Sequence, residues 1–181
     1  RALGVWIVAG TLPLLPTGQR NGKPCAASLV VDEHGECVAR YDKMHLFGFQ
    51  KDNESYDESR TILHGDHVGY FAAPFGRVGL SVCYDLRFPE LYRALGDCAL
   101  IVVPSAFTDT TGQAHWDVLL RARAIENQCY VLAAAQSGTH RNGRRTWGHS
   151  MLIDPWGDVL SVLPEGEGVV SGVLDTARLA A

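Results

Sequence analysis

Short apolar stretches recur along the chain, separated by polar and turn-forming residues. They are rich in Val, Ile, Leu and Ala, the composition that favours a pleated, partly buried surface. The stretches that we predict to be strands are Val5–Leu12, Ala26–Val31, Gly69–Ala73, Val78–Cys83, Leu100–Val103, Tyr130–Ala135, Ser150–Ile153, Val159–Val162 and Val169–Leu174. Pro74-Phe75-Gly76 and Pro155-Trp156-Gly157 carry turn signals between neighbouring stretches and predict two hairpins.

Two segments show helical rather than alternating spacing. Phe88–Leu95 carries Pro89 near its first turn, where proline is preferred. Ala114–Gln128 repeats its apolar and large side chains every three to four residues. Strands that alternate with both helices and hairpins predict an α/β sandwich, because a wholly parallel sheet would contain no hairpins.

One long connection interrupts this pattern. Residues 47–67 are polar and irregular, and they follow Tyr41–Phe47, which has the sequence of a strand end. Connections of this length inside compact domains are usually functional. We therefore expect this stretch to contribute to a site.

Length and composition limit the classes of protein to be considered. A chain of 181 residues is one domain by length, and we assign residues 1–181 to it. The net charge of −4 gives no electrostatic footprint for nucleic acid or an anionic membrane, and no apolar run reaches membrane-spanning length. Five cysteines without zinc-ligand spacing predict free thiols and a cytoplasmic location. The histidines show no paired spacing and the sequence has no Gly-rich phosphate loop, so we expect no metal and no cofactor.

The two ends of the sequence suggest a piece of a longer protein. Arg1–Gly4 resembles the tail of a helix with a glycine cap, and it runs directly into an apolar stretch. Leu174–Leu179 resembles a strand followed by the first turn of a helix. We expect the domain to be incomplete at both termini.

Cys83 lies where a predicted strand meets a predicted helix. A strand fixes the Cβ of a nucleophile, while the first turn of a helix offers unpaired N–H groups and the positive end of a dipole. Such N–H groups can bind the oxyanion of a tetrahedral intermediate. The alternative is a buried core cysteine before a turn.

Several motifs together carry a family resemblance over nearly the whole chain. They are Tyr41–Leu46, Gly79–Glu90, Arg121–Asn127, Trp147–Ser150 and Asp154–Gly157. In this order they resemble the nitrilase superfamily of carbon–nitrogen hydrolases. Three more segments, Pro104–Phe107, Thr111–Trp116 and Ala133–Gln136, look most like its Nit branch of deaminated-glutathione amidase and ω-amidase. The resemblance implies a nitrilase-like α-β-β-α sandwich.

The resemblance also implies a Glu-Lys-Cys site that cleaves a carboxamide through an enzyme-bound thioester and releases ammonia. Cys83 matches the nucleophile and Tyr84 the residue whose N–H faces the oxyanion. Lys43, 40 residues before Cys83, matches the lysine. Glu58 matches a second glutamate that holds this lysine and the substrate in place by a charge-assisted hydrogen bond, with Glu54 as the local alternative. For Glu58 and Lys43 the alternative interpretation is an ordinary exposed charge.

One position of the family pattern has no counterpart. The general-base glutamate of the family lies ahead of the strand that Val5–Leu12 represents, and no glutamate of this sequence occupies that motif. Glu126 is better explained as a structural ion pair with Arg123. Loss of a general base lowers the rate by roughly 10²–10⁴-fold, so the 181 residues alone are expected to hydrolyse amides weakly or not at all.

The segment after Cys83 suggests how a substrate is held. Arg87 can bind a substrate carboxylate through two hydrogen bonds, and the alternative is a structural pair with Asp85 or Glu90. The first reading favours an ω-amide of a dicarboxylic or keto acid. Three residues beyond the Leu100–Val103 strand are candidates for lining the pocket: Phe107, Thr111 and His115.

Two other functions remain open at this point. One is a nitrilase acting on nitriles, although its members usually carry a pair other than Tyr84-Asp85 after the cysteine. The other is a catalytically silent domain that binds a small acid or a partner protein, which the missing base favours. The resemblance implies a homodimer through helices that flank the cysteine.

Overall fold

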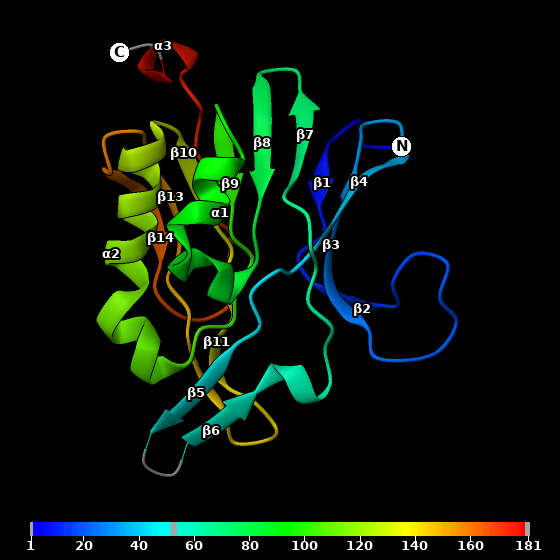
Figure 1. The fold of residues 1–181 in the computed structure, drawn as a ribbon. Helices are drawn as coiled ribbons and strands as arrows, with labels where there is room; N and C mark the ends of the chain where they lie inside the picture. Colours follow the sequence, from blue (N-terminus) through cyan, green and yellow to red (C-terminus); the bar gives the residue numbers. More distant parts are fainter. Residues whose placement is uncertain (1, 52–53, 180–181) are drawn as a thin grey trace.

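The computed structural model describes residues 2–51 and 54–179. Its first part is a four-stranded antiparallel sheet (Figure 1). β3 (Cys25–Val31) pairs with β1 (Ile7–Val8), β2 (Leu12–Leu14) and β4 (Cys37–Asp42). The predicted strand Val5–Leu12 is therefore wrong as one element. It is divided at Gly10, whose φ of 40° is unfavourable for a strand.

The second sheet has six strands in the order β14-β13-β10-β9-β8-β7. The strands are β7 (Gly69–Ala73), β8 (Gly76–Leu80), β9 (Leu100–Val102), β10 (Tyr130–Ala133), β13 (Ser150–Ile153) and β14 (Val159–Leu163). β8, β9 and β10 are parallel, and the outer pairs are antiparallel. The two predicted hairpins are confirmed as β7–β8 and β13–β14, and so is the mixed α/β class.

Helices cover the outer face of the six-stranded sheet, while the four-stranded sheet lies on its other side (Figure 1). α1 spans Pro89–Ala94 and α2 spans Asp109–Asn127. α2 begins five residues earlier than predicted because the Thr108 side chain accepts a hydrogen bond from Thr111 N–H. Trp6 stacks on Phe71 at 5.4 Å between the two sheets. The layers helix, sheet, sheet are thus present.

Smaller elements lie at one end of the sandwich. β5 (Gly48–Lys51) pairs with β6 (Glu54–Asp57), and a 3₁₀ helix follows at Glu58–Arg60. The expectation of an irregular stretch over residues 47–67 is therefore wrong in part. A second hairpin, β11 (Ser137–Thr139) with β12 (Arg145–Trp147), was not predicted either.

The last predicted strand, Val169–Leu174, is wrong. Val169 and Val173 are 88% and 84% exposed, and no strand is assigned there, so this apolar segment has no ladder partner among the described residues. The chain ends in the short helix α3 (Thr176–Leu179), whose first turn is capped by the Asp175 carboxylate.

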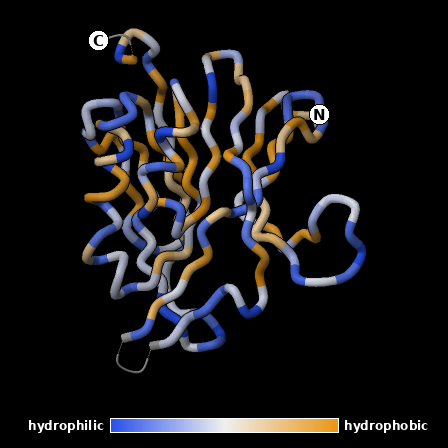
Figure 2. The backbone as a smooth tube through the Cα atoms, viewed as in Figure 1, coloured by the Kyte–Doolittle hydropathy of each residue, from blue (hydrophilic) through white to orange (hydrophobic). Residues whose placement is uncertain are grey.

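Apolar positions run through the strands of both sheets, and polar positions gather in the loops (Figure 2). The four-stranded sheet also exposes apolar side chains, including Ile7 and Val38. None of the helices in residues 2–51 and 54–179 combines the length and hydropathy that a bilayer crossing requires.

Candidate active site

The turn that carries Cys83 is strained. β8 ends at Leu80, Val82 is extended, and a 3₁₀ helix spans Cys83–Arg87. Cys83 has a φ of 52°, which is uncommon for a residue other than glycine and persists only where the surroundings enforce it. Cys83 N–H donates to Pro104 O at 3.0 Å and so fixes the turn to the end of β9. The predicted strand Val78–Cys83 therefore ends three residues early.

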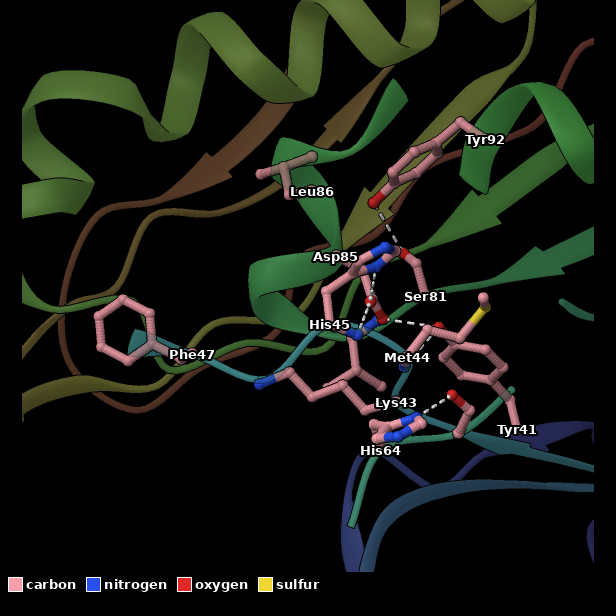
Figure 3. A network of polar contacts seen from close by, with 12 residues as sticks. Tyr41, Lys43, Met44, His45, Phe47, His64, Ser81, Asp85, Leu86 and Tyr92 are labelled. Carbon is pink, nitrogen blue, oxygen red and sulfur yellow. Dashed lines mark hydrogen bonds and ion pairs between the residues drawn. The ribbon is translucent and has the colours of Figure 1, made fainter. Parts of the chain in front are cut away.

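A buried carboxylate joins the cysteine turn to the segment that follows β4 (Figure 3). Asp85 is fully buried. Its Oδ2 accepts from Tyr41 O–H at 2.7 Å and from Val82 N–H at 2.9 Å. Its Oδ1 accepts from the His45 backbone N–H and ring Nδ1 at 2.9 and 2.8 Å. Three donors from residues 41–45 thus hold the Cys83 turn against that segment, and the fourth, Val82 N–H, closes the turn itself.

Lys43 is buried, with 1% of its surface exposed. Figure 3 shows its side chain pointing away from the Asp85 network, on the side of Phe47. Its Nζ lies 2.5 Å from Glu58 Oε2, and the same oxygen accepts from Phe47 N–H at 2.7 Å. A buried ammonium requires such a partner. The side chain of Glu54, the alternative to Glu58, lies outside the described residues.

Lys43, Glu58 and Cys83 line one cavity at this end of the sandwich. Of the other predicted site residues, Tyr84, Phe107 and Thr111 line it as well. Lys43 and Cys83, separated by 40 positions in the sequence, therefore meet in one space.

The surroundings of the Cys83 thiol have opposing effects on its pKa. Burial raises its pKa above the ordinary thiol value, because the thiolate loses solvation. The Lys43 charge, a hydrogen bond from the Ala106 backbone and the Arg144 charge each lower that pKa, while Glu58 raises it. Ionisation of this thiol therefore depends on the cations around it.

The 3₁₀ helix offers a donor beside the sulfur. Cys83 N–H is engaged by Pro104 O, and Asp85 N–H donates to Val82 O at 3.1 Å. Tyr84 lies between them in the first turn, where a helix provides no internal acceptor for an N–H group. Tyr84 and Lys43 both line the cavity that contains Cys83, and the oxyanion role of the Tyr84 N–H stays a prediction.

Two predicted residues lie elsewhere. Arg87 and His115 are not among the residues that line the cavity. Arg87 Nη2 lies 3.3 Å from His115 Nδ1, and its guanidinium lies over the rings of Tyr84 and Phe107 at 5.8 and 5.5 Å. The alternative partner Asp85 is already engaged by four other donors. The role of Arg87 in binding stays a prediction.

The predicted structural pair of Glu126 and Arg123 is confirmed, with Nη1 and Oε1 2.5 Å apart. Arg123 is buried, and its Nε and Nη2 both donate to Leu86 O, at 3.1 and 2.8 Å. α2 thereby holds the 3₁₀ helix of the cysteine turn from its outer side.

Sequence reasoning missed Arg144. The run Arg141–Arg145 reads as an exposed Asn-Gly turn, and residues 141–143 are indeed exposed. Arg144 instead lines the cavity together with Gln136. The only signal was its place just after the turn of a hairpin, where side chains alternate between two faces. The description of this run as a solvated loop is wrong for Arg144.

No group of three or more His, Cys, Asp and Glu side chains in the described part of the chain has an arrangement that could hold a metal ion.

Comparison with known proteins identifies the family. The carbon–nitrogen hydrolase family model matches residues 1–181. The chain belongs to the carbon–nitrogen hydrolases. It is 46% identical over 183 residues to a deaminated glutathione amidase of Yersinia enterocolitica, covering 99% of this chain and 64% of that protein. This hydrolase chain thus spans less than two thirds of that relative's length.

Solved structures agree on the fold. Saccharomyces cerevisiae Nit3, a member of branch 10 of the nitrilase superfamily, matches with a TM-score of 0.85 and 30% identity, over 98% of this chain and 62% of that one. A variant of the amidase from Nesterenkonia sp. AN1 matches with a TM-score of 0.78 and 29% identity, over 93% of this chain and 62% of that one. That structure shows the result of Michael addition of acrylamide at the active site cysteine. The nitrilase-like fold predicted for this hydrolase is confirmed.

Proposed function

We propose that this chain is the part of a carbon–nitrogen hydrolase that cleaves a carboxamide with the Cys83 thiol as nucleophile. The observation that supports this most strongly is the cavity that Cys83 shares with Lys43, whose charge lowers the pKa of the thiol. A cation beside a thiol increases the thiolate fraction, and the thiolate is the nucleophile. We take residues 1–181 as one partial domain.

The proposed reaction has two stages. The thiolate attacks the amide carbon, an S–C bond forms, and the carbonyl electrons move to oxygen, which faces Tyr84 N–H and the Lys43 ammonium. Return of those electrons breaks the C–N bond, and the nitrogen leaves with the proton taken from the thiol. Water then hydrolyses the thioester. Glu58 keeps Lys43 in place and lines the same cavity, where it can also hold the substrate.

The proton in this scheme needs a base. In the family it is a glutamate ahead of β1, and no glutamate of this sequence matches it. Without such a base the thioester stage slows by roughly 10²–10⁴-fold. We therefore expect the 181 residues alone to react with an amide but to turn over poorly.

The substrate that we propose is an ω-amide of a dicarboxylic or keto acid, of the kind named for the Yersinia relative, deaminated glutathione. The product amine is ammonia where the amide nitrogen is unsubstituted. All five cysteines are free, which is consistent with a reducing, cytoplasmic location.

Ammonia release from α-ketoglutaramate tests this function in a longer polypeptide that carries the family's upstream glutamate. We expect Cys83→Ala to abolish release and Cys37→Ala, at an exposed thiol, to leave it unchanged. An active Cys83→Ala protein would rule out the thioester. A folded wild-type protein that binds the amide but releases no ammonia would support the binding-domain alternative.

A further inference from the structure

Arg144 reaches the catalytic cavity from the β11–β12 hairpin. The hairpin is attached to the segment after β9, because Trp147 N–H donates to Phe107 O at 3.1 Å and Thr146 forms a bridge with Thr108. Arg144 Nη2 donates to Ala106 O at 2.5 Å, and its guanidinium lies 5.1 Å from the centre of the Tyr56 ring. Two contacts therefore fix the position of this cation.

One donor of this guanidinium is left without an acceptor. Arg144 Nε is buried, and no hydrogen-bond partner for it exists among the described residues. Buried donors are almost always paired, so the described residues do not satisfy the full donor capacity of this guanidinium.

The charges of the cavity point to an anionic ligand. The charged side chains in its described lining are Lys43, Glu58 and Arg144. Lys43 and Glu58 form an ion pair, so the uncompensated charge is that of Arg144. Arg144 also borders a second, more open hollow together with Ala106, Gln136, His140 and Arg141. A ligand that extends outward from Cys83 passes this guanidinium.

We propose that Arg144 is the anchor for a carboxylate of the substrate, which accepts from its guanidinium and lets the site select acidic over neutral amides. This inference rests on the proposed function and adds a residue that determines specificity. A planar guanidinium suits a carboxylate better than an ammonium does. Arg87, predicted for this role, pairs instead with His115 outside the cavity lining.

The test compares the rates at which iodoacetate and iodoacetamide alkylate Cys83. The first reagent carries a carboxylate where the second carries a neutral carboxamide. In both reactions the thiolate sulfur forms the S–C bond as the C–I bond breaks and iodide leaves. Neither reaction needs the general base. The ratio of the two rates also cancels any change in the thiolate fraction. Peptide mass spectrometry reports Cys83 and, as an internal reference, the exposed Cys37.

We expect the iodoacetate-to-iodoacetamide ratio at Cys83 to fall about tenfold in Arg144→Gln, the factor for loss of one charge-assisted hydrogen bond. Arg144→Lys should retain part of the ratio. Arg145→Gln, at the exposed neighbour, should leave it unchanged, and the ratio at Cys37 should stay constant in every variant.

A ratio at Cys83 that is the same in wild type and Arg144→Gln, with both reagents reacting, would overturn the anchor and leave the proposed function intact. A Cys83 that reacts with neither reagent in the folded wild type would overturn both. Should Arg144→Gln fail to fold, protection of wild-type Cys83 from iodoacetamide decides the matter. Glutarate should protect it, whereas the neutral 1,5-pentanediol should not, and equal effects of the two would overturn the anchor.

Discussion

The Cys83 thiol is the residue on which the proposed chemistry depends, and its ionisation is set by opposing effects. Burial, the largest of them, raises its pKa, and Lys43 is the first of the groups that lower it. Glu58 raises it. The Lys43–Glu58 pair therefore tunes the thiol through the balance of its two charges, since both residues line the same cavity.

This balance predicts opposite pH shifts for two variants. Lys43→Gln removes a cation that favours the thiolate, so the thiol pKa rises and the midpoint of Cys83 alkylation moves to higher pH. Glu58→Gln removes an anion that disfavours it, so the midpoint moves to lower pH. Iodoacetamide labelling across pH 6 to 11 measures both midpoints, with Cys37 as reference.

Loss of the Lys43 ammonium also removes the proposed donor to the oxyanion, and kcat of a protein with its base in place should fall roughly 10²–10³-fold. An unchanged alkylation midpoint in Lys43→Gln would contradict the proposed pairing of cation and thiol.

At the residue scale, Cys83 could be singled out from its place between a predicted strand and a predicted helix. Lys43 and Glu58 could be predicted only through the family resemblance, because nothing in the local pattern brings positions 43 and 83 together. Arg144 was not predicted as a site residue because its neighbours form an Asn-Gly turn, and such a turn predicts that the whole run is exposed to solvent. The tertiary contact with Ala106 that turns it inward has no sequence signal.

At the scale of elements, the Cys83 turn depends on Asp85. Its carboxylate accepts from two segments, residues 41–45 and the end of β8, and so fixes the distance between the lysine and cysteine elements. α1 is joined to the same region, because Tyr92 O–H donates to Ser81 Oγ at 3.0 Å. Asp85 is a positioning residue and is absent from the cavity lining.

Asp85→Asn should destabilise the fold by about 2–4 kcal/mol, since the amide nitrogen cannot accept and leaves buried donors unpaired. Urea unfolding measures the change. Asp97→Asn, at an exposed carboxylate before β9, is the matched control and should change stability by less than about 0.5 kcal/mol. Equal stability of the two variants would show that the Asp85 network does not hold the turn.

Apolar runs bounded by turn residues predicted the exact bounds of β7 and β13. They also predicted the two hairpins β7–β8 and β13–β14. Such runs gave wrong strand predictions where tertiary contacts determine the backbone conformation. Val78–Cys83 reads as one strand, but Cys83 adopts a positive φ that no propensity favours. Val169–Leu174 has the composition of a strand and lacks a neighbour with which to pair among the described residues.

At the scale of the whole molecule, the two sheets and the helical layer place the cavity at the ends of the strands, where β9 and β10 lead into residues 104–108 and 136. The class of fold followed from the mixture of hairpins and helices. The α-β-β-α order of the layers followed from the resemblance, because pairing between distant strands leaves no local signal.

We propose that the protein forms a homodimer through helices flanking the cysteine. The exposed face of α1 carries Glu90 and Arg93, and in a two-fold interface one protomer's glutamate can face its partner's arginine. Light scattering should give twice the 19.7 kDa of one chain. Arg93→Glu should halve that mass, whereas Arg20→Glu, in an exposed loop, should not. A single-chain mass for the wild type at all concentrations would contradict the dimer.

Whether Cys83 is the nucleophile of an amide-cleaving site can be decided by peptide mass spectrometry after incubation with α-ketoglutaramate, first of this chain and then of a longer polypeptide that carries the family's upstream glutamate. We expect an acyl group on the peptide that contains Cys83, removable by hydroxylamine, and none on Cys37. A folded longer polypeptide that gains no acyl group at Cys83 and releases no ammonia would show that Cys83 is not the nucleophile.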